Sequence, residues 1–285
     1  MDIQTIAVIG SGTMGTGIAQ ISAMHGYNTI LFDINDVALK KAKLNIEIAL
    51  ENLAQKQKIT AEQKNASLQR IAYTSEFSEI NADLVIEAIV ENLSAKQELF
   101  SALEERLPET ALFCSNTSSI PITQIASACK HPQRVIGMHF FNPAPVMKLV
   151  EVIAGEASDK KLVEVVKNVA EKMGKTAILV KDYPGFIVNR VARHFYGESL
   201  KILSEQVAEM EQIDELLEAT GFKMGAFKLM DLIGVDVNFS VTVSLFNSFY
   251  QDARFRPNLI QQKKVEAKFW GRKTGKGFYI YPEQK

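Results

Sequence analysis

The chain has 285 residues, of which 47% are hydrophobic and 23% are charged, and its formal net charge is -1. This composition excludes an intrinsically disordered chain and gives no globally basic surface for binding nucleic acid. A chain of this length suits one large domain with a smaller one, or two domains of similar size, and can bury a substantial core.

Cysteine usage and the distribution of apolar residues exclude further classes of protein. The two cysteines, Cys114 and Cys129, have no Cys-x-x-Cys or His-Cys spacing, so neither a disulfide scaffold nor a metal site is expected. The N-terminus enters a strand pattern without a signal-like segment, and no apolar run is as long as a membrane span. We therefore expect a cytoplasmic protein that binds neither a metal nor a membrane.

A glycine-rich motif near the N-terminus predicts a dinucleotide-binding fold. The apolar run of residues 5–9 ends directly in GSGTMG, residues 10–15, and a helical pattern follows. A G-x-G-x-x-G motif is weak by itself, but a strand before it and a helix after it form the setting in which it binds a pyrophosphate. The first glycine permits the tight turn, the second lets the phosphates approach, and the third allows close helix packing. We expect cofactor contacts from Gly10, Gly12, Thr13, Met14 and Gly15.

The second predicted strand, residues 28–32, indicates which dinucleotide is bound. It ends in Asp33, whose carboxylate can accept hydrogen bonds from the adenosine ribose and repels a 2′-phosphate. Ile34 supplies no compensating arginine, so the sequence predicts NAD rather than NADP. The alternative is a glycine-rich turn with a capping aspartate and no ligand.

A pair of predicted helices separates the second strand from the next one. Residues 37–57 have apolar side chains along one stripe, and a second helix follows Thr60, a suitable N-terminal cap. A standard crossover is shorter, so we expect this pair to project from the sheet. Lys56 and Lys58 near its tip could meet a phosphate-rich group, although for Lys58 a purely solvated role is favoured.

Two further apolar runs predict buried parallel strands. Residues 83–90 form the first, and residues 111–115 form the second, which ends in NTSS, residues 116–119. Ligands of such sheets bind at the carboxyl ends of the strands, so this polar cluster is placed to hold a substrate hydroxyl or carbonyl. The alternative role is helix capping, because Pro121 opens another helix and Ser119 is expected to cap it.

The next stretch predicts a histidine beside a carboxylate. Residues 135–140 and 147–153 are apolar runs separated by the break NPAP, residues 142–145, and strands joined so closely can pair only antiparallel. Pairing centred on the break places His139 opposite Glu151, as a general base beside its orienting partner. The alternatives are a core histidine and a solvated glutamate, but two ionisable groups on apolar strands are costly to bury unless they meet each other or a substrate.

The rest of the chain predicts one more helix and strand, and then a helical domain. Ser158 is expected to cap a helix, and residues 176–180 form the last strand before a boundary at residues 181–185. The helices expected beyond it cover residues 186–205, 213–220 and 227–249, with a last one after Pro257. The predicted fold is therefore α/β, with a Rossmann-like, mostly parallel sheet with an antiparallel edge over residues 1–183, followed by an all-α domain over residues 184–285.

The long helical segment of residues 227–249 carries more apolar side chains than a helical domain of about 100 residues needs for its own core. A subunit interface would bury this excess, so we expect a homodimer formed through the C-terminal domain.

With these pieces placed, the whole chain resembles the 3-hydroxyacyl-CoA dehydrogenase family, and in particular its short bacterial 3-hydroxybutyryl-CoA dehydrogenases. The matching segments are GSGTMG, EAIVENLSAKQELF, SNTSS, GMHFFNPAPVMKLVEV, DYPGFIVNR, LMDLIGVDV and GRKTGKGFY. The resemblance implies an NAD-binding domain followed by a C-terminal substrate and dimerisation domain. It also implies reversible NAD-dependent oxidation of an (S)-3-hydroxyacyl-CoA, in the first place 3-hydroxybutyryl-CoA, to the 3-oxoacyl-CoA.

The same resemblance implies roles for individual residues. His139 would be the general base, Glu151 would hold and polarise it, and Ser118 and Asn189 would contact the reacting oxygen of the substrate. Lys56 would contact the CoA phosphates. NAD contacts are implied for Glu91, Lys96, Asn116, Asn142 and Lys273.

The chain departs from the family pattern in residues 221–230, GFKMGAFKLM, where relatives often carry prolines and a glutamate. Lys223 and Lys228 are the departures. A changed surface is the simpler interpretation. The alternative is that the added positive charge near the acyl end favours a dicarboxylic substrate, such as the 3-hydroxyadipyl-CoA of phenylacetate breakdown.

Two other functions compete with this one. A crystallin-like relative would keep the fold and lose catalysis, but the intact set of Ser118, His139, Glu151 and Asn189 argues against it. A β-hydroxyacid dehydrogenase would use a catalytic lysine, and the helix FIVNRVARHF has an asparagine at the corresponding place.

Overall fold

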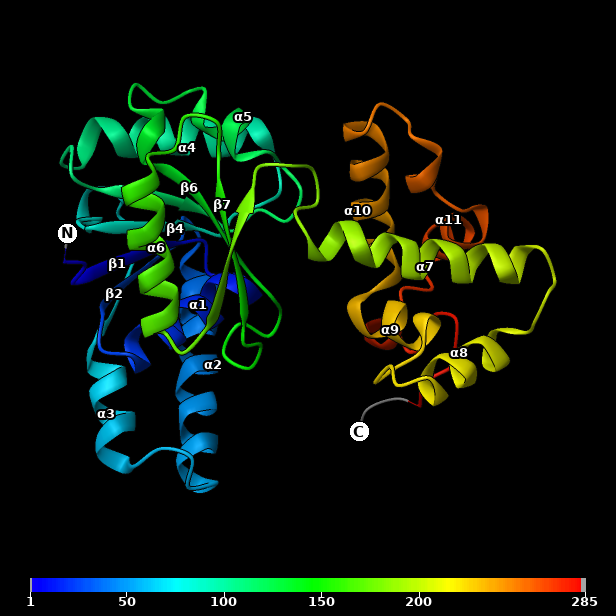
Figure 1. Ribbon diagram of the computed structural model, residues 1–285. Coiled ribbons are helices and arrows are strands. Elements are labelled where there is room, and N and C mark those ends of the chain that lie inside the picture. The colour runs from blue at the N-terminus through cyan, green and yellow to red at the C-terminus, as the bar shows by residue number, and fades with distance from the viewer. Residues whose placement is uncertain (1, 283–285) are drawn as a thin grey trace. The chain divides into compact units, whose positions relative to one another are not determined.

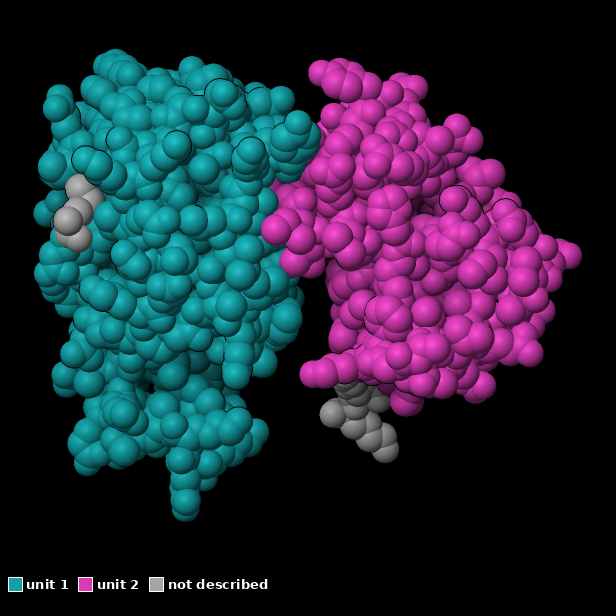
Figure 2. All heavy atoms as spheres, in the orientation of Figure 1, with its two compact units in different colours: residues 1–183 teal, residues 184–285 magenta. Residues whose placement is uncertain are grey.

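The computed structural model describes residues 2–282 (Figure 1). The chain divides into two compact units, residues 1–183 and residues 184–285, which Figure 2 shows in teal and magenta.

The first unit is built on one sheet of eight strands in the order β3-β2-β1-β4-β5-β6-β7-β8. The strands are β1 Thr5–Ile9, β2 Asn28–Phe32, β3 Ile71–Thr74, β4 Leu84–Glu87, β5 Leu112–Ser115, β6 Val135–Phe140, β7 Leu149–Ala154 and β8 Thr176–Lys181. All neighbours from β3 to β6 are parallel, whereas β6 and β7 are antiparallel and β8 is parallel to β7. The mostly parallel sheet with an antiparallel edge is therefore confirmed.

Helices cover both faces of this sheet (Figure 1). They are α1 Thr13–Met24, α2 Asp36–Gln55, α3 Ala61–Gln69, α4 Leu93–Arg106, α5 Ile122–Ala126 and α6 Lys160–Lys172. Apolar side chains of α1, α2 and α6 share one core with Leu112 and Cys114 of β5. Phe113 lies between these two and points to the opposite face, where the Phe100 ring of α4 lies 5.9 Å from it.

Local hydrogen bonds explain where several helices begin. Thr60 caps α3 as predicted, because its hydroxyl accepts from the Gln63 amide N–H at 3.2 Å and Gln63 reaches back to the Thr60 amide. The predicted cap of α6 was wrong by one residue. The Asp159 carboxylate accepts from the first amides of that helix, while the Ser158 hydroxyl donates to the Val135 carbonyl of the neighbouring strand at 2.7 Å.

Strand β4 is shorter than the apolar run of residues 83–90 predicts. Sheet pairing ends at Glu87, whose carboxylate accepts from the Ile89 amide at 2.8 Å and turns the chain. Residue 88 then passes under the glycine-rich turn, and a Cβ built at Gly10 would lie 2.7 Å from the Ala88 carbonyl oxygen. Gly10 has φ +100°, a conformation that favours glycine.

The second unit is helical, as predicted, with α7 Val188–Ser204, α8 Met210–Ala219, α9 Ala226–Ile233, α10 Val235–Ser248 and α11 Leu259–Glu266. The prediction of one continuous segment over residues 227–249 was wrong. Gly234, with φ +106°, separates α9 from α10, and the two helices are bent by 99°. Leu232, Ile233 and Val237 beside this bend are between 43% and 48% exposed.

None of the helices within residues 2–282 is, taken singly, long and apolar enough to cross a membrane. The bent pair of α9 and α10 meets the length and composition test when its members are combined.

Candidate active site

Of the three glycines in the turn between β1 and α1, Gly12 alone has open space where a Cβ would lie. A Cβ at Gly15 would lie 1.7 Å from the Gly10 carbonyl oxygen, so the helix packs directly on the turn. A Cβ at Gly12 would meet no atom within 4 Å. The open side of the turn is therefore at Gly12, at the N-terminus of a helix of 12 residues, where an anion is favoured.

Asp33, at the end of β2, is fixed against this turn. Its Oδ2 accepts from the amide and the hydroxyl of Ser11 at 2.7 and 2.8 Å, and its Oδ1 accepts from the Asn35 amide at 3.0 Å. A carboxylate has about four acceptor sites, so one is left for a ribose hydroxyl. The residues present fit an adenosine dinucleotide.

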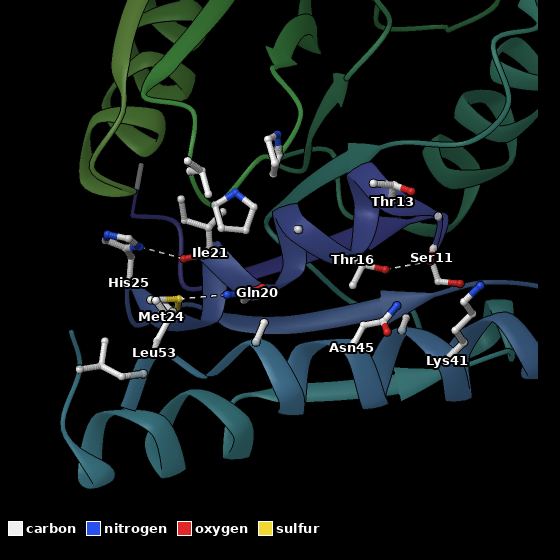
Figure 3. Close-up of a pocket in the computed structure, with 18 of the residues that line it drawn as sticks. Ser11, Thr13, Thr16, Gln20, Ile21, Met24, His25, Lys41, Asn45 and Leu53 are labelled. Atoms are coloured by element: carbon white, nitrogen blue, oxygen red, sulfur yellow. Dashed lines mark hydrogen bonds between the residues drawn. The ribbon is translucent and has the colours of Figure 1, made fainter. Parts of the chain in front are cut away.

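A cavity of about 940 Å³ opens between α1, α2 and the turn after β6 (Figure 3). At one end it reaches Gly12 and Thr13, and Lys41 and Asn45 of α2 point into it. Its apolar wall is formed by Ile21, Ala42, Ala49, Leu53, Ile59, Pro143, Pro145 and Val146. Lys58, expected to be merely solvated, lines the cavity, whereas Lys56 is not among the residues that line it.

The strand pairing of β6 with β7 places His139 opposite Glu151, in the predicted register. The His139 Nδ1 lies 2.8 Å from the Glu151 Oε2, and the two residues are only 5% and 1% exposed. The Phe141 ring lies 4.5 Å from the imidazole. Because a carboxylate only accepts hydrogen bonds, Nδ1 carries the proton and Nε2 is the basic nitrogen.

The turn between β6 and β7 is held by a lysine that sequence reasoning missed. Lys175 donates from its Nζ to the carbonyl oxygens of Ala144 and Met147 at 2.5 and 2.7 Å. Burial lowers the pKa of its ammonium group. No sequence signal marks a lysine that bonds only to backbone carbonyls, so the structure alone reveals it.

A buried ionic network underlies the ends of β4 and β5. Glu87 is completely buried, and its carboxylate accepts from Lys96 Nζ and from the Ser115 hydroxyl, both at 2.6 Å. Lys96 is also 3.1 Å from Glu91. Glu87 was overlooked, although an acidic residue inside the apolar run DLVIEAIV is a usable sequence signal.

Glu91 orders the polar cluster that follows β5. Its Oε1 accepts from the Thr117 hydroxyl at 2.6 Å, from the Ser118 amide at 3.0 Å and from the Ser119 hydroxyl at 3.2 Å. Burial alone would raise the pKa of Glu91, but Lys96 and these donors outweigh it and hold the pKa below its usual range. Glu91 is therefore a carboxylate at neutral pH.

The structure shows contacts of two members of the cluster that the sequence analysis did not predict. The Asn116 Oδ1 accepts from the Phe140 amide at 2.8 Å and so ties the cluster to the strand of His139. Ser119 does not cap α5, which corrects that prediction. The Asp182 carboxylate does so instead, accepting from the amides of Ile122 and Thr123 at 2.8 and 2.7 Å.

The remaining predicted site residues belong to the second unit. Asn189 lies in the first turn of α7, and the Lys273 ammonium group is 2.7 Å from the Asp236 carboxylate. Lys228 is paired with Glu218 at 2.9 Å, and this hydrogen bond raises the pKa of the lysine. The charge of Lys228 thus has a counter-ion within its own unit.

Two family models match the chain and together cover nearly all of it. Residues 5–183 match the NAD-binding domain of 3-hydroxyacyl-CoA dehydrogenase, and residues 185–281 match the C-terminal domain of the same family.

Individual relatives are similar over the full chain. This chain is 48% identical to the 3-hydroxyadipyl-CoA dehydrogenase of Escherichia coli. The match covers 100% of this chain and 60% of the length of that relative. It is 42% identical to the probable 3-hydroxybutyryl-CoA dehydrogenase of Bacillus subtilis, over 100% of this chain and 99% of that one. The crystal structure of (S)-3-hydroxybutyryl-CoA dehydrogenase from Ralstonia eutropha superposes with a TM-score of 0.95 at 37% identity, over 99% of this chain and 100% of its own.

Proposed function

The chain belongs to the 3-hydroxyacyl-CoA dehydrogenase family, and from this premise we propose that it oxidises an (S)-3-hydroxyacyl-CoA to the 3-oxoacyl-CoA, reversibly, with NAD. The observation that carries the proposal is the buried pair of His139 and Glu151, joined at 2.8 Å. Such a pair supplies a base whose tautomer is fixed and whose protonated form is stabilised.

In the proposed oxidation, His139 Nε2 accepts the proton of the C3 hydroxyl. NAD bound at the glycine-rich turn would supply the hydride acceptor. Glu151 stabilises the imidazolium that forms. Ser118 and Asn189 hold the oxygen as it becomes a carbonyl. Glu91 supports this role of Ser118, since it accepts from the Ser118 amide at 3.0 Å and fixes that backbone.

The cofactor position is supported by the open backbone at Gly12, where a Cβ would meet no atom within 4 Å, and by the acceptor site left on Asp33. Further NAD contacts are proposed for Glu91, Lys96, Asn116, Asn142 and Lys273. These assignments depend on the family resemblance.

The CoA part of the substrate is proposed to occupy the cavity of about 940 Å³ along α1 and α2. An apolar wall suits the pantetheine arm, and Lys41 and Lys58 offer positive charge to the phosphates. Lys56, an exposed residue at the C-terminal cap of α2, is a weaker candidate for the same role.

Two acyl groups are candidates. The Bacillus subtilis and Ralstonia eutropha relatives are named for 3-hydroxybutyryl-CoA, whereas the Escherichia coli relative is named for 3-hydroxyadipyl-CoA. We propose a short-chain 3-hydroxyacyl-CoA as the general substrate. A homodimer formed through the second unit is proposed from the exposed Leu232, Ile233 and Val237.

The test of the proposed reaction follows NADH absorbance with a panel of 3-oxoacyl-CoA esters that differ in length and tail charge. We expect NADH to be consumed with at least one short ester. No consumption with any ester would rule out the enzyme and leave the crystallin-like alternative.

A further inference from the structure

Arg193, on α7, carries a buried positive charge, and its hydrogen-bond acceptors among residues 2–282 are neutral oxygens. Its guanidinium donates to the Asn238 carbonyl oxygen at 2.8 Å, to the Thr242 hydroxyl at 2.9 Å and to the Asn189 carbonyl oxygen at 3.3 Å. The residue is 5% exposed. Within the described part of this unit, the cations that meet carboxylates are Lys201, Lys228, Arg254 and Lys273.

Burial lowers the pKa of Arg193 to about 10, and the nearby Tyr196 opposes that shift. The Tyr196 ring lies 4.8 Å from the guanidinium carbon. The group is still charged at neutral pH. A buried charge is unfavourable unless an anion joins it.

The side-chain amide nitrogen of Asn238, next to Arg193, has no hydrogen-bond acceptor among the described residues. Asn238 is 1% exposed, and its Oδ1 accepts from Gln261 Nε2 at 2.8 Å and from Arg193 Nη1 at 3.3 Å. Its Nδ2 is buried and meets no acceptor in the described chain. Flipping the amide would turn its NH₂ group toward the Arg193 donor, so the orphaned donor is not an error of assignment. The Arg193 guanidinium and the Asn238 amide nitrogen lie side by side, and a single anionic group could accept hydrogen bonds from both.

We propose that Arg193 and Asn238 bind the terminal carboxylate of a dicarboxylic 3-hydroxyacyl-CoA. The inference rests on the proposed function, and in particular on Asn189 holding the oxygen at C3 of the substrate.

The spacing along α7 favours an acyl chain of about six carbons. Arg193 follows Asn189 by four residues, about one helical turn or ~6 Å, and its side chain folds back to the Asn189 carbonyl at 3.3 Å. A six-carbon diacid has its second carboxyl group three bonds beyond C3, which is a comparable reach. A four-carbon acyl group ends one bond beyond C3 in a methyl group, which offers no carboxylate to Arg193 and Asn238.

This assignment differs from the one that the sequence suggested. The sequence offered Lys223 and Lys228 as an alternative source of positive charge, but Glu218 compensates Lys228 at 2.9 Å. Arg193 combines burial with the lack of an ion pair among the described residues, and sequence inspection did not single it out.

The experiment compares kcat/KM for 3-oxoadipyl-CoA and 3-oxohexanoyl-CoA, which have the same chain length and differ in the charge of the tail. We expect the wild-type protein to prefer the diacid by about 10- to 100-fold, the range for a hydrogen bond to a charged group. Arg193→Met should remove that preference. Arg190→Met, on the same helix with its guanidinium over the Phe249 ring at 5.1 Å, is the matched control and should keep it.

A second variant keeps the test decisive if Arg193→Met does not fold. Asn238→Asp places a carboxylate beside Arg193, so we expect it to raise thermal stability. Because this carboxylate would pair with the guanidinium in place of the substrate carboxylate, we also expect the variant to lose the preference for the diacid. Equal wild-type rates with the two esters, or an unchanged preference in folded Arg193→Met or Asn238→Asp, would overturn the inference while leaving the dehydrogenase function intact. No reaction with any ester would instead contradict the proposed function.

Discussion

The Nζ of Lys96 lies 2.6 Å from the Glu87 Oε1, and the two side chains are 1% and 0% exposed. Removing one member of a buried ion pair leaves an uncompensated charge in the interior. We expect Lys96→Met to lower the free energy of unfolding by about 3–5 kcal/mol, as measured by urea denaturation at neutral pH.

Glu87→Gln is the matched control for this variant. Lys96 then keeps Glu91 as a counter-ion at 3.1 Å, so the loss of stability should be clearly smaller. Similar losses in both variants would show that the destabilisation does not arise from the orphaned Glu87 charge.

His139→Ala removes the proposed base and should lower kcat by about 10²–10⁴-fold. The NAD dissociation constant should stay within error of the wild type, because the glycine-rich turn and Asp33 are untouched. Glu151→Gln keeps the shape but not the charge that stabilises the imidazolium, so a smaller loss is expected. Turnover at the wild-type rate in His139→Ala would remove this residue from the mechanism.

The two glycines of the nucleotide turn should respond differently to alanine. In Gly12→Ala the new methyl group meets no protein atom within 4 Å, so thermal stability should change little while NAD affinity falls. In Gly15→Ala the methyl group would lie 1.7 Å from the Gly10 carbonyl oxygen, so the fold itself should be destabilised. Calorimetric melting and NAD titration of both variants check this. Unchanged NAD affinity in Gly12→Ala would place the pyrophosphate elsewhere.

Glu104 should contribute to stability in a pH-dependent way. Burial alone would raise its pKa, but the amides of Lys130 and His131 and the Arg134 guanidinium outweigh it and lower the pKa. A carboxyl group whose pKa is lower in the folded than in the unfolded state stabilises the fold above its unfolded pKa of about 4.3, and that contribution is lost as the pH falls through the folded value.

Comparison with Glu104→Gln isolates this contribution. At pH 7 the variant should be less stable than the wild type, and the difference in unfolding free energy should shrink as the pH is lowered from 5 to 3. A difference that stays constant over that range would contradict the lowered pKa.

The sequence predicted those features that rest on short-range patterns. Strand runs, the glycine-rich motif and the proline break can all be recognised within a few residues of sequence. The register of His139 with Glu151 followed from the short break, because an antiparallel pairing centred near Pro145 sets these two residues opposite each other. The antiparallel pairing of β6 with β7 followed from the same break.

The features that escaped prediction depend on contacts between distant segments. Asp182 caps α5 from 60 positions along the chain, which no local capping pattern can reveal. Gly234 was taken for part of a continuous helix, because an isolated glycine in an apolar run does not show whether the chain bends there. Arg193 looked like an ordinary helix arginine, since burial without a counter-ion is visible only in three dimensions.

Lys175, which immediately precedes β8, binds two carbonyls of the turn between β6 and β7. The two hydrogen bonds of its ammonium group link the start of β8 to the turn between β6 and β7. We therefore expect the strands from β6 to β8 to open as one cooperative unit in native-state hydrogen exchange. Lys175→Met should uncouple them, with the amides of residues 144–148 exchanging much faster than those of the flanking strands. The rate at which His139 and Glu151 separate should then depend on Lys175, a residue outside both of their strands.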